Sequence, residues 1–136
     1  MKILKSLILL MLLLLNSITY AQSQEIQYSG GLAFISGGVG SDESDVMQAN
    51  AKKWPLMLQF SQIDQKGWGS WVSGVRVRIF NEQKEEIFTN ECDGPFLLIA
   101  LKPGQYVIEA LFDGVAQQRK VNIGKDQSEK VSIYWK

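Results

Sequence analysis

The sequence contains no histidine, and this absence restricts its chemistry more than any other feature. Without imidazole there can be no Ser-His-Asp or Cys-His nucleophile pair, and the usual zinc sites lose a main ligand. Cysteine is almost absent as well, because Cys92 is the only one among 136 residues, so no intrachain disulfide can form. The stability of the folded protein must therefore come from its apolar core.

The single thiol lies between two acidic residues, Glu91 and Asp93. Nearby negative charge disfavours the thiolate, so Cys92 is predicted to be a poor nucleophile that lies buried or half-buried at the end of a strand. The alternative is an intermolecular disulfide, which would link two copies of the chain into a dimer through Cys92.

Long apolar runs are absent except at the amino end. Two lysines precede an uncharged apolar stretch, residues 7–15, and Thr19 and Ala21 place small residues at the −3 and −1 positions of a cleavage site. This pattern predicts a signal peptide over residues 1–21, cut after Ala21. A transmembrane anchor is the alternative, but a bilayer span needs about 20 apolar residues. The processed protein is expected to be periplasmic or secreted, with no stable membrane anchor.

An excess of charge of either sign is also lacking, since 14 Lys and Arg residues stand against 14 Asp and Glu residues. Cleavage would remove Lys2 and Lys5 but no acid, which leaves 12 basic against 14 acidic residues and a net charge of −2. Nucleic acids and anionic membranes are bound by basic surfaces, so neither is expected as a partner.

Removing 21 of the 136 residues leaves 115, the usual size of one domain. Its later part, residues 71–136, has the period-two alternation and the Gly, Pro, Asn and Asp breaks of β-strands. Residues 75–79 alternate between apolar side chains and arginine, which predicts one buried and one exposed face. Residues 96–101 are apolar on both faces, which predicts a central strand.

The dipeptide Asp113-Gly114 is typical of a two-residue type I′ hairpin turn and is the strongest local signal in the chain. A hairpin closed by this turn pairs Phe112 with Val115 and Tyr106 with Val121. The side chains that this register directs into the core are Tyr106, Ile108, Ala110, Phe112 and Val121.

The preceding segment, residues 22–70, is predicted to pack on this sandwich as a strand, a glycine loop, a helix and a second strand. The first strand is short, at 32–35, and alternation places the second at 56–60. Between them an apolar stripe with helical spacing predicts a helix over residues 42–54, which Pro55 ends.

The loop before the predicted helix is a candidate structural turn and helix N-cap. Its residues are Gly37, Gly38, Gly40, Ser41, Asp42 and Glu43. Free backbone N–H groups at a helix start can bind phosphate, but the glycine spacing of nucleotide-binding loops is missing and the acids would repel an anion. A divalent cation held by Asp42, Glu43 and Asp45 is a further alternative, without EF-hand spacing to support it.

Trp68 and Trp71 are the candidate binding residues, in a loop that also contains Gly67 and Gly69. Two large aromatic side chains in a glycine-rich loop can stack on sugar rings or anchor a partner protein. Trp71, at the start of a strand, is expected instead to cap the core of the sandwich. For Trp68, packing and recognition both remain open.

Several motifs of residues 74–123 occur together in one known family. They are Val75-Arg76-Val77, Asp93-Gly94-Pro95-Phe96, the L-x-P-G-x-Y pattern Leu101-Lys102-Pro103-Gly104-Gln105-Tyr106, and the turn at Gly114. This stretch resembles the carboxypeptidase regulatory-like domain, and the upstream glycine loop with its acids is similar to small exported bacterial proteins that carry it and have no assigned activity. The resemblance implies a transthyretin-like or Ig-like antiparallel β-sandwich without catalytic residues of its own.

The expected fold is thus mainly β, with about seven strands and one short N-terminal helix. The expected function is a non-catalytic binding or interaction module of the bacterial cell envelope, with an envelope protein or a glycan as partner and with no metal or cofactor. The first alternative is a secreted factor, an effector or inhibitor that acts on a host or competitor. A carboxylate-based hydrolase is less favoured, because the acids fall in turns and on solvent faces.

Overall fold

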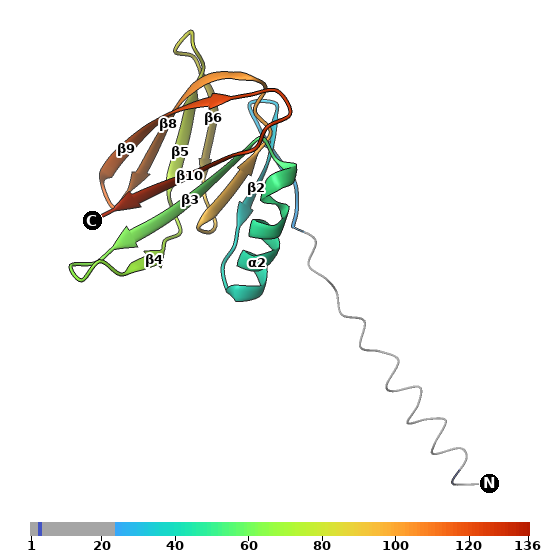
Figure 1. Ribbon diagram of the computed structural model, residues 1–136, viewed down its shortest axis with the longest axis vertical. Coiled ribbons are helices and arrows are strands. Elements are labelled where there is room, and N and C mark those ends of the chain that lie inside the picture. The colour runs from blue at the N-terminus through green and yellow to red at the C-terminus, as the bar shows by residue number, and fades with distance from the viewer. Residues whose placement is uncertain (1–2, 4–23) are drawn as a thin grey trace.

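The computed structural model describes Ile3 and residues 24–136. Apart from Ile3, the predicted signal peptide lies outside these described residues. Within them the chain forms ten strands in two sheets and a short α-helix that continues into a 3-10 turn (Figure 1). No helix in this part of the chain is long and apolar enough to cross a membrane.

The larger sheet has six strands and the smaller has four. In spatial order the larger sheet contains β1 (Gln27–Ser29), β2 (Leu32–Gly37), β7 (Phe96–Ile99), β3 (Leu56–Ile63) and β10 (Glu129–Trp135), with β4 (Gly69–Trp71) paired to β3. The smaller sheet contains β6 (Glu86–Glu91), β5 (Arg76–Phe80), β8 (Gly104–Phe112) and β9 (Val115–Ile123). Neighbouring strands are antiparallel except β10 and β3, which are parallel.

The two sheets face each other across one apolar core. Leu58, Phe60 and Ile133 project into it from the larger sheet, and Ile79 and Ile108 project from the smaller, all fully buried. In β5, β8 and β10 buried side chains alternate with more exposed ones, because successive residues of a strand point to opposite faces. The first five residues of β3 are buried on both faces. The result is a two-layer, sandwich-like arrangement, as the alternation in the sequence predicted.

The β8–β9 hairpin is confirmed residue for residue. Phe112 pairs with Val115 and Tyr106 pairs with Val121. Asp113 and Gly114 have φ angles of 49° and 74°, and two positive φ angles in succession are what a type I′ turn requires. Three of the five side chains expected in the core are buried, and Tyr106 and Phe112 pack against it half-buried.

The helix lies on the outer face of the larger sheet. It consists of α2 (Ser41–Asn50) and the 3-10 turn η2 (Ala51–Lys53), and α2 contacts β2 and β7. Met47 is fully buried in a second apolar cluster, together with Met57, Phe96 and Leu98 from the sheet. Strand β7 is therefore buried on both faces, which confirms its prediction as a central strand.

Two expectations about the fold are wrong. The strand count was expected to be about seven, but the described residues form ten, partly because β1 and β4 have only three residues each and are too short to show alternation. The helix lies between β2 and β3, where the strands expected at 32–35 and 56–60 placed it, but the α-helix expected over residues 42–54 is too long, because α2 ends at Asn50 and the last turn tightens into η2 before Pro55.

Candidate functional site

One carboxylate organises the tip of the β3–β4 hairpin. Asp64 Oδ1 accepts hydrogen bonds from the backbone N–H groups of Lys66 and Trp68, both at 2.9 Å. The Asp64 N–H donates to the Trp68 carbonyl at 2.9 Å, and the Gly67 N–H donates to the Asp64 carbonyl at 3.0 Å. Gly67 has a φ of 83°, a left-handed conformation that glycine adopts without strain. These bonds hold the backbone under Trp68 in one conformation.

The Trp68 side chain is 73% exposed on this ordered tip. It borders an open groove of about 740 Å³. The groove is lined by Gln62, Ile63, Asp64, Gln65, Gly67, Trp68, Ser70 and Lys136. An exposed indole therefore lies beside amide, hydroxyl and ammonium groups that can all form hydrogen bonds with a ligand.

Replacing Asp64 with alanine should loosen this tip. The backbone N–H groups of Lys66 and Trp68 would lose their hydrogen-bond acceptor. The free energy of unfolding should therefore fall by about 1 kcal/mol. Asp64→Asn keeps an oxygen acceptor at the same position and should lose less than half of that amount. Urea unfolding followed by circular dichroism measures both variants, and an Asp64→Ala protein as stable as the unmodified one would contradict this role.

Trp71 lies on a different surface from Trp68. Its ring packs on Phe96 with 4.9 Å between ring centroids, and Phe96 belongs to the apolar cluster beneath α2. The expectation that Trp71 caps the core between the sheets is therefore wrong, since its side chain points to the outer face and stays 53% exposed. The hairpin register explains this orientation, because Trp71 pairs with Ser61, which follows the inward-facing Phe60.

A third aromatic side chain, Tyr134, shares the face of Trp71. It alternates with the buried Ile133 and Trp135 and is 41% exposed. Tyr134 pairs with Ser61 on one side of β3, and Trp71 pairs with Ser61 on the other. Register partners point to the same face of a sheet, so these three side chains form a row across β4, β3 and β10. Tyr134 was not a candidate from the sequence.

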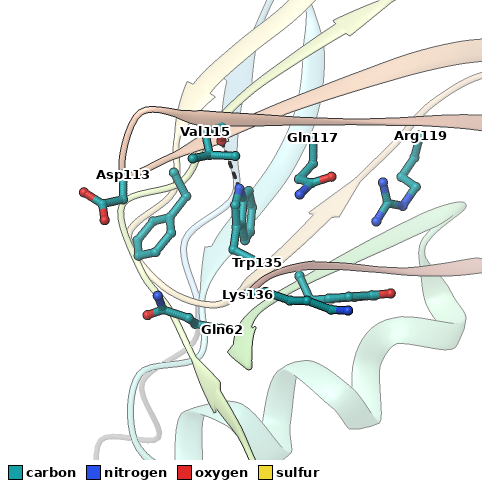
Figure 2. Close-up of a pocket in the computed structure, with 9 residues that line it drawn as sticks. Gln62, Asp113, Val115, Gln117, Arg119, Trp135 and Lys136 are labelled. Carbon is teal, nitrogen blue, oxygen red and sulfur yellow. Dashed lines mark hydrogen bonds between the residues drawn. The ribbon is translucent and has the colours of Figure 1, made fainter. Parts of the chain in front are cut away.

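A cleft of about 460 Å³ lies beside β9 and β10 (Figure 2). Trp135 points from β10 toward β9, and its Nε1–H donates to the Val115 carbonyl at 2.9 Å. Gln117 and Arg119 extend from the same strand as Val115 along the cleft. Gln62 and Lys136 border both this cleft and the Trp68 groove, so the two form one continuous polar surface.

In the glycine loop before α2, the Glu43 carboxylate is hydrogen-bonded to the backbone of the loop itself. Gly40, with a φ of 85°, is the N-cap of α2, and Ser41 is the first helical residue and makes no capping hydrogen bond. Glu43 reaches back so that its Oε1 accepts the Gly38 N–H at 3.1 Å. This bond makes the Glu43 carboxylate part of the turn. Asp42 adds a second acid to the first helical turn, where the helix dipole favours negative charge.

The described residues contain no group of three or more Cys, Asp and Glu side chains placed to hold a metal ion. Cys92 is 1% exposed at the end of β6, which confirms the buried strand-end prediction. Burial raises the pKa of its thiol to about 12, and hydrogen bonds from Ser36 and Asn90 offset only part of that rise. A disulfide between two copies would require this part of the core to open.

No protein-family model matches the chain, and no curated protein does. Among solved structures, it is similar to the TIE protein of Bacillus anthracis, with a TM-score of 0.40 and 18% identity over 60% of this chain and 16% of that one. It is also similar to a "putative carbohydrate binding protein" of Pseudomonas aeruginosa, with a TM-score of 0.39 and 12% identity over 66% of this chain and 95% of that one. The chain thus spans about a sixth of the first protein, and the likeness to both is that of a β-rich fold at low identity.

Proposed function

We propose that this chain is an exported, non-catalytic binding module of the bacterial cell envelope, built on a transthyretin-like sandwich of the carboxypeptidase regulatory-like type. The observation that carries the proposal is Trp68, a 73% exposed indole on a hairpin tip that Asp64 holds in place. The L-x-P-G-x-Y motif, which ends at Tyr106, supports the domain type. Residues 1–21 support export.

An exposed tryptophan on an ordered backbone is suited to binding for two reasons. Covering its large apolar surface with a ligand lowers the free energy of the complex. For this reason Trp is enriched among the interface residues that dominate affinity. Because the Asp64 carboxylate already fixes the loop backbone, little conformational entropy is lost when a ligand binds. Without a ligand, the exposed apolar surface of the indole stays in contact with water, which is unfavourable.

The surroundings of Trp68 favour a polar partner. Gln62 and Gln65 supply amides, and Lys136 supplies an ammonium group, in the groove beside the ring. This mixture suits the hydroxyl groups of a glycan or the backbone of an envelope protein, and it does not suit an apolar surface. The partner is therefore a glycan or a protein of the envelope.

Co-sedimentation with the isolated envelope fraction of the producing bacterium tests the proposal. The protein recovered from these cells should begin at Gln22 and sediment with the envelopes. Trp68→Ala should weaken this binding by about thirtyfold, the effect of losing about 2 kcal/mol at a dominant interface residue. Loss of binding after protease treatment of the envelopes would assign a protein partner, and its persistence would assign a glycan.

The matched control is Tyr28→Ala, because Tyr28 is also 73% exposed but lies on β1 at the opposite edge of the larger sheet. It should bind as the unmodified protein does, and both variants should keep the same melting temperature. Equal sedimentation of Trp68→Ala and Tyr28→Ala would overturn the proposal, as would an unmodified protein that stays in the supernatant.

A further inference from the structure

We propose that the outer face of the larger sheet is a second binding surface, which takes an extended β-1,4-linked oligosaccharide lying across strands β4, β3 and β10. Trp71 and Tyr134 would each stack on one sugar ring, and a sugar between them would lie over Ser61. Tyr134 also lines the cleft beside β9 and β10, so this surface adjoins the one that contains Trp68. The inference does not depend on the function proposed for Trp68.

The spacing of the two aromatic residues comes from the sheet itself. Trp71 and Tyr134 are the register partners of Ser61 on its two sides, so they lie two strand widths apart. Neighbouring strands are about 4.8 Å apart, which places the two backbone positions about 9.6 Å from each other. Side chains that start this far apart on one sheet face suit two sugars of one chain better than a single sugar.

An extended β-1,4-linked chain matches this spacing. Successive sugars in such a chain turn over, so every second ring presents the same face, and that two-sugar repeat is close to two strand widths. Trp71 and Tyr134 can therefore stack on the first and third sugars of one chain. The chain must stay flat to do so, because both aromatic residues belong to one sheet face.

The side chain between the two aromatic residues is an uncharged hydroxyl. Ser61 lies half-buried between them, and the neighbouring row across β7, β3 and β10 holds Phe96, Gln59 and Ser132. Phe96 and Gln59 are buried, whereas Ser132 is exposed, and its Oγ accepts a hydrogen bond from Gln59 Nε2–H at 3.2 Å. Exposed hydroxyl groups beside two aromatic rings suit a ligand with apolar ring faces and hydroxylated edges.

Other occupants fit this face less well. With 53% and 41% of their surface exposed, Trp71 and Tyr134 together offer on the order of 200 Å² of aromatic surface, whereas a stable protein interface needs about 800 Å² per partner. An apolar helix or a lipid surface would bury the hydroxyl of Ser61 without a hydrogen-bond partner, which costs free energy. A hydroxylated ligand satisfies that group.

Calorimetric titration of the purified protein with cellotetraose and chitotetraose tests the inference, with the curved α-1,4-linked maltotetraose as the comparison ligand. At least one of the two extended tetrasaccharides should bind, and maltotetraose should bind about tenfold more weakly or not at all. Trp71→Ala and Tyr134→Thr should each weaken binding by about tenfold. Threonine keeps a strand-forming residue in β10.

Two further variants separate this surface from the Trp68 groove and from simple unfolding. Ser61→Arg keeps both aromatic residues and fills the space between them, so it should block binding while the melting temperature stays near that of the unmodified protein. Trp68→Ala should bind the tetrasaccharides normally. The inference is overturned if neither extended sugar binds, if maltotetraose binds equally well, or if Trp68→Ala abolishes binding while Trp71→Ala does not.

Discussion

Gly94→Ala is expected to lower the free energy of unfolding by about 3 kcal/mol, because an added methyl group would overlap the backbone carbonyl of Gly37. Gly94 lies in the turn that leads from β6 to β7, and this turn packs directly on the end of β2. A backbone carbonyl cannot rotate away as a side chain can, so either β2 or the turn must move. The neighbouring hydrogen bond from the Asp93 N–H to Ser36 Oγ, 2.9 Å long, would be strained by the same movement.

Gly69→Ala is the matched control for this variant. Gly94 and Gly69 both lack a positive φ, so alanine is conformationally acceptable at each position, and a methyl group on Gly69 meets no atom within 4 Å. Urea unfolding followed by circular dichroism should show Gly69→Ala within about 0.5 kcal/mol of the unmodified protein. If the two alanine variants were equally stable, the close approach of Gly94 to β2 would have no energetic consequence.

The second large effect is a loss of stability above pH 9, caused by Cys92. Burial raises the pKa of its thiol from 9.0 to about 12, so between these values the folded protein keeps a proton that the unfolded chain has released. Stability is unaffected by this group below pH 9 and falls as the pH rises, by about 1.4 kcal/mol for each pH unit, until the folded thiol ionises near pH 12.

Urea unfolding of the unmodified protein and of Cys92→Ala at pH 8, 9, 10 and 11 isolates this contribution. Lysine and tyrosine side chains also titrate in this range, but both proteins contain the same set, so the difference in slope belongs to Cys92. The unmodified protein should lose stability more steeply above pH 9, and its thiol should resist alkylation until the protein unfolds. Parallel slopes, or rapid alkylation of the folded protein at pH 8, would contradict a buried thiol.

Local signals in the sequence predicted the smaller sheet well. The Asp113-Gly114 turn determines the β8–β9 register because a two-residue turn leaves no freedom in how its strands pair. The buried strand β7 was also predictable, because a strand with apolar side chains on both faces must be packed against other elements on both faces. Here that cover is the smaller sheet on one side and α2 on the other.

The candidate site was only partly predictable because it depends on contacts between distant segments. Trp68 was found from composition and loop position, and it is exposed as recognition requires. The predicted orientation of the Trp71 side chain was wrong. The orientation depends on the pairing of β4 with β3, and a strand of three residues is too short to show alternation in the sequence. Alternation with Ile133 and Trp135 does place Tyr134 outward, but nothing local shows that β10 lies parallel to β3, which is what brings Tyr134 beside Ser61.

The parallel pairing of β10 with β3 also affects the order in which the molecule can assemble. The hydrogen bond between Gln59 and Ser132 joins residues 73 positions apart, so β3 keeps an unpaired edge until β10 is available. Pairing at such long separation is slow, because chain entropy must be lost before any contact forms. If the chain is exported amino end first, as proposed, the larger sheet would thus stay incomplete until β10, close to the carboxyl end, had emerged on the far side.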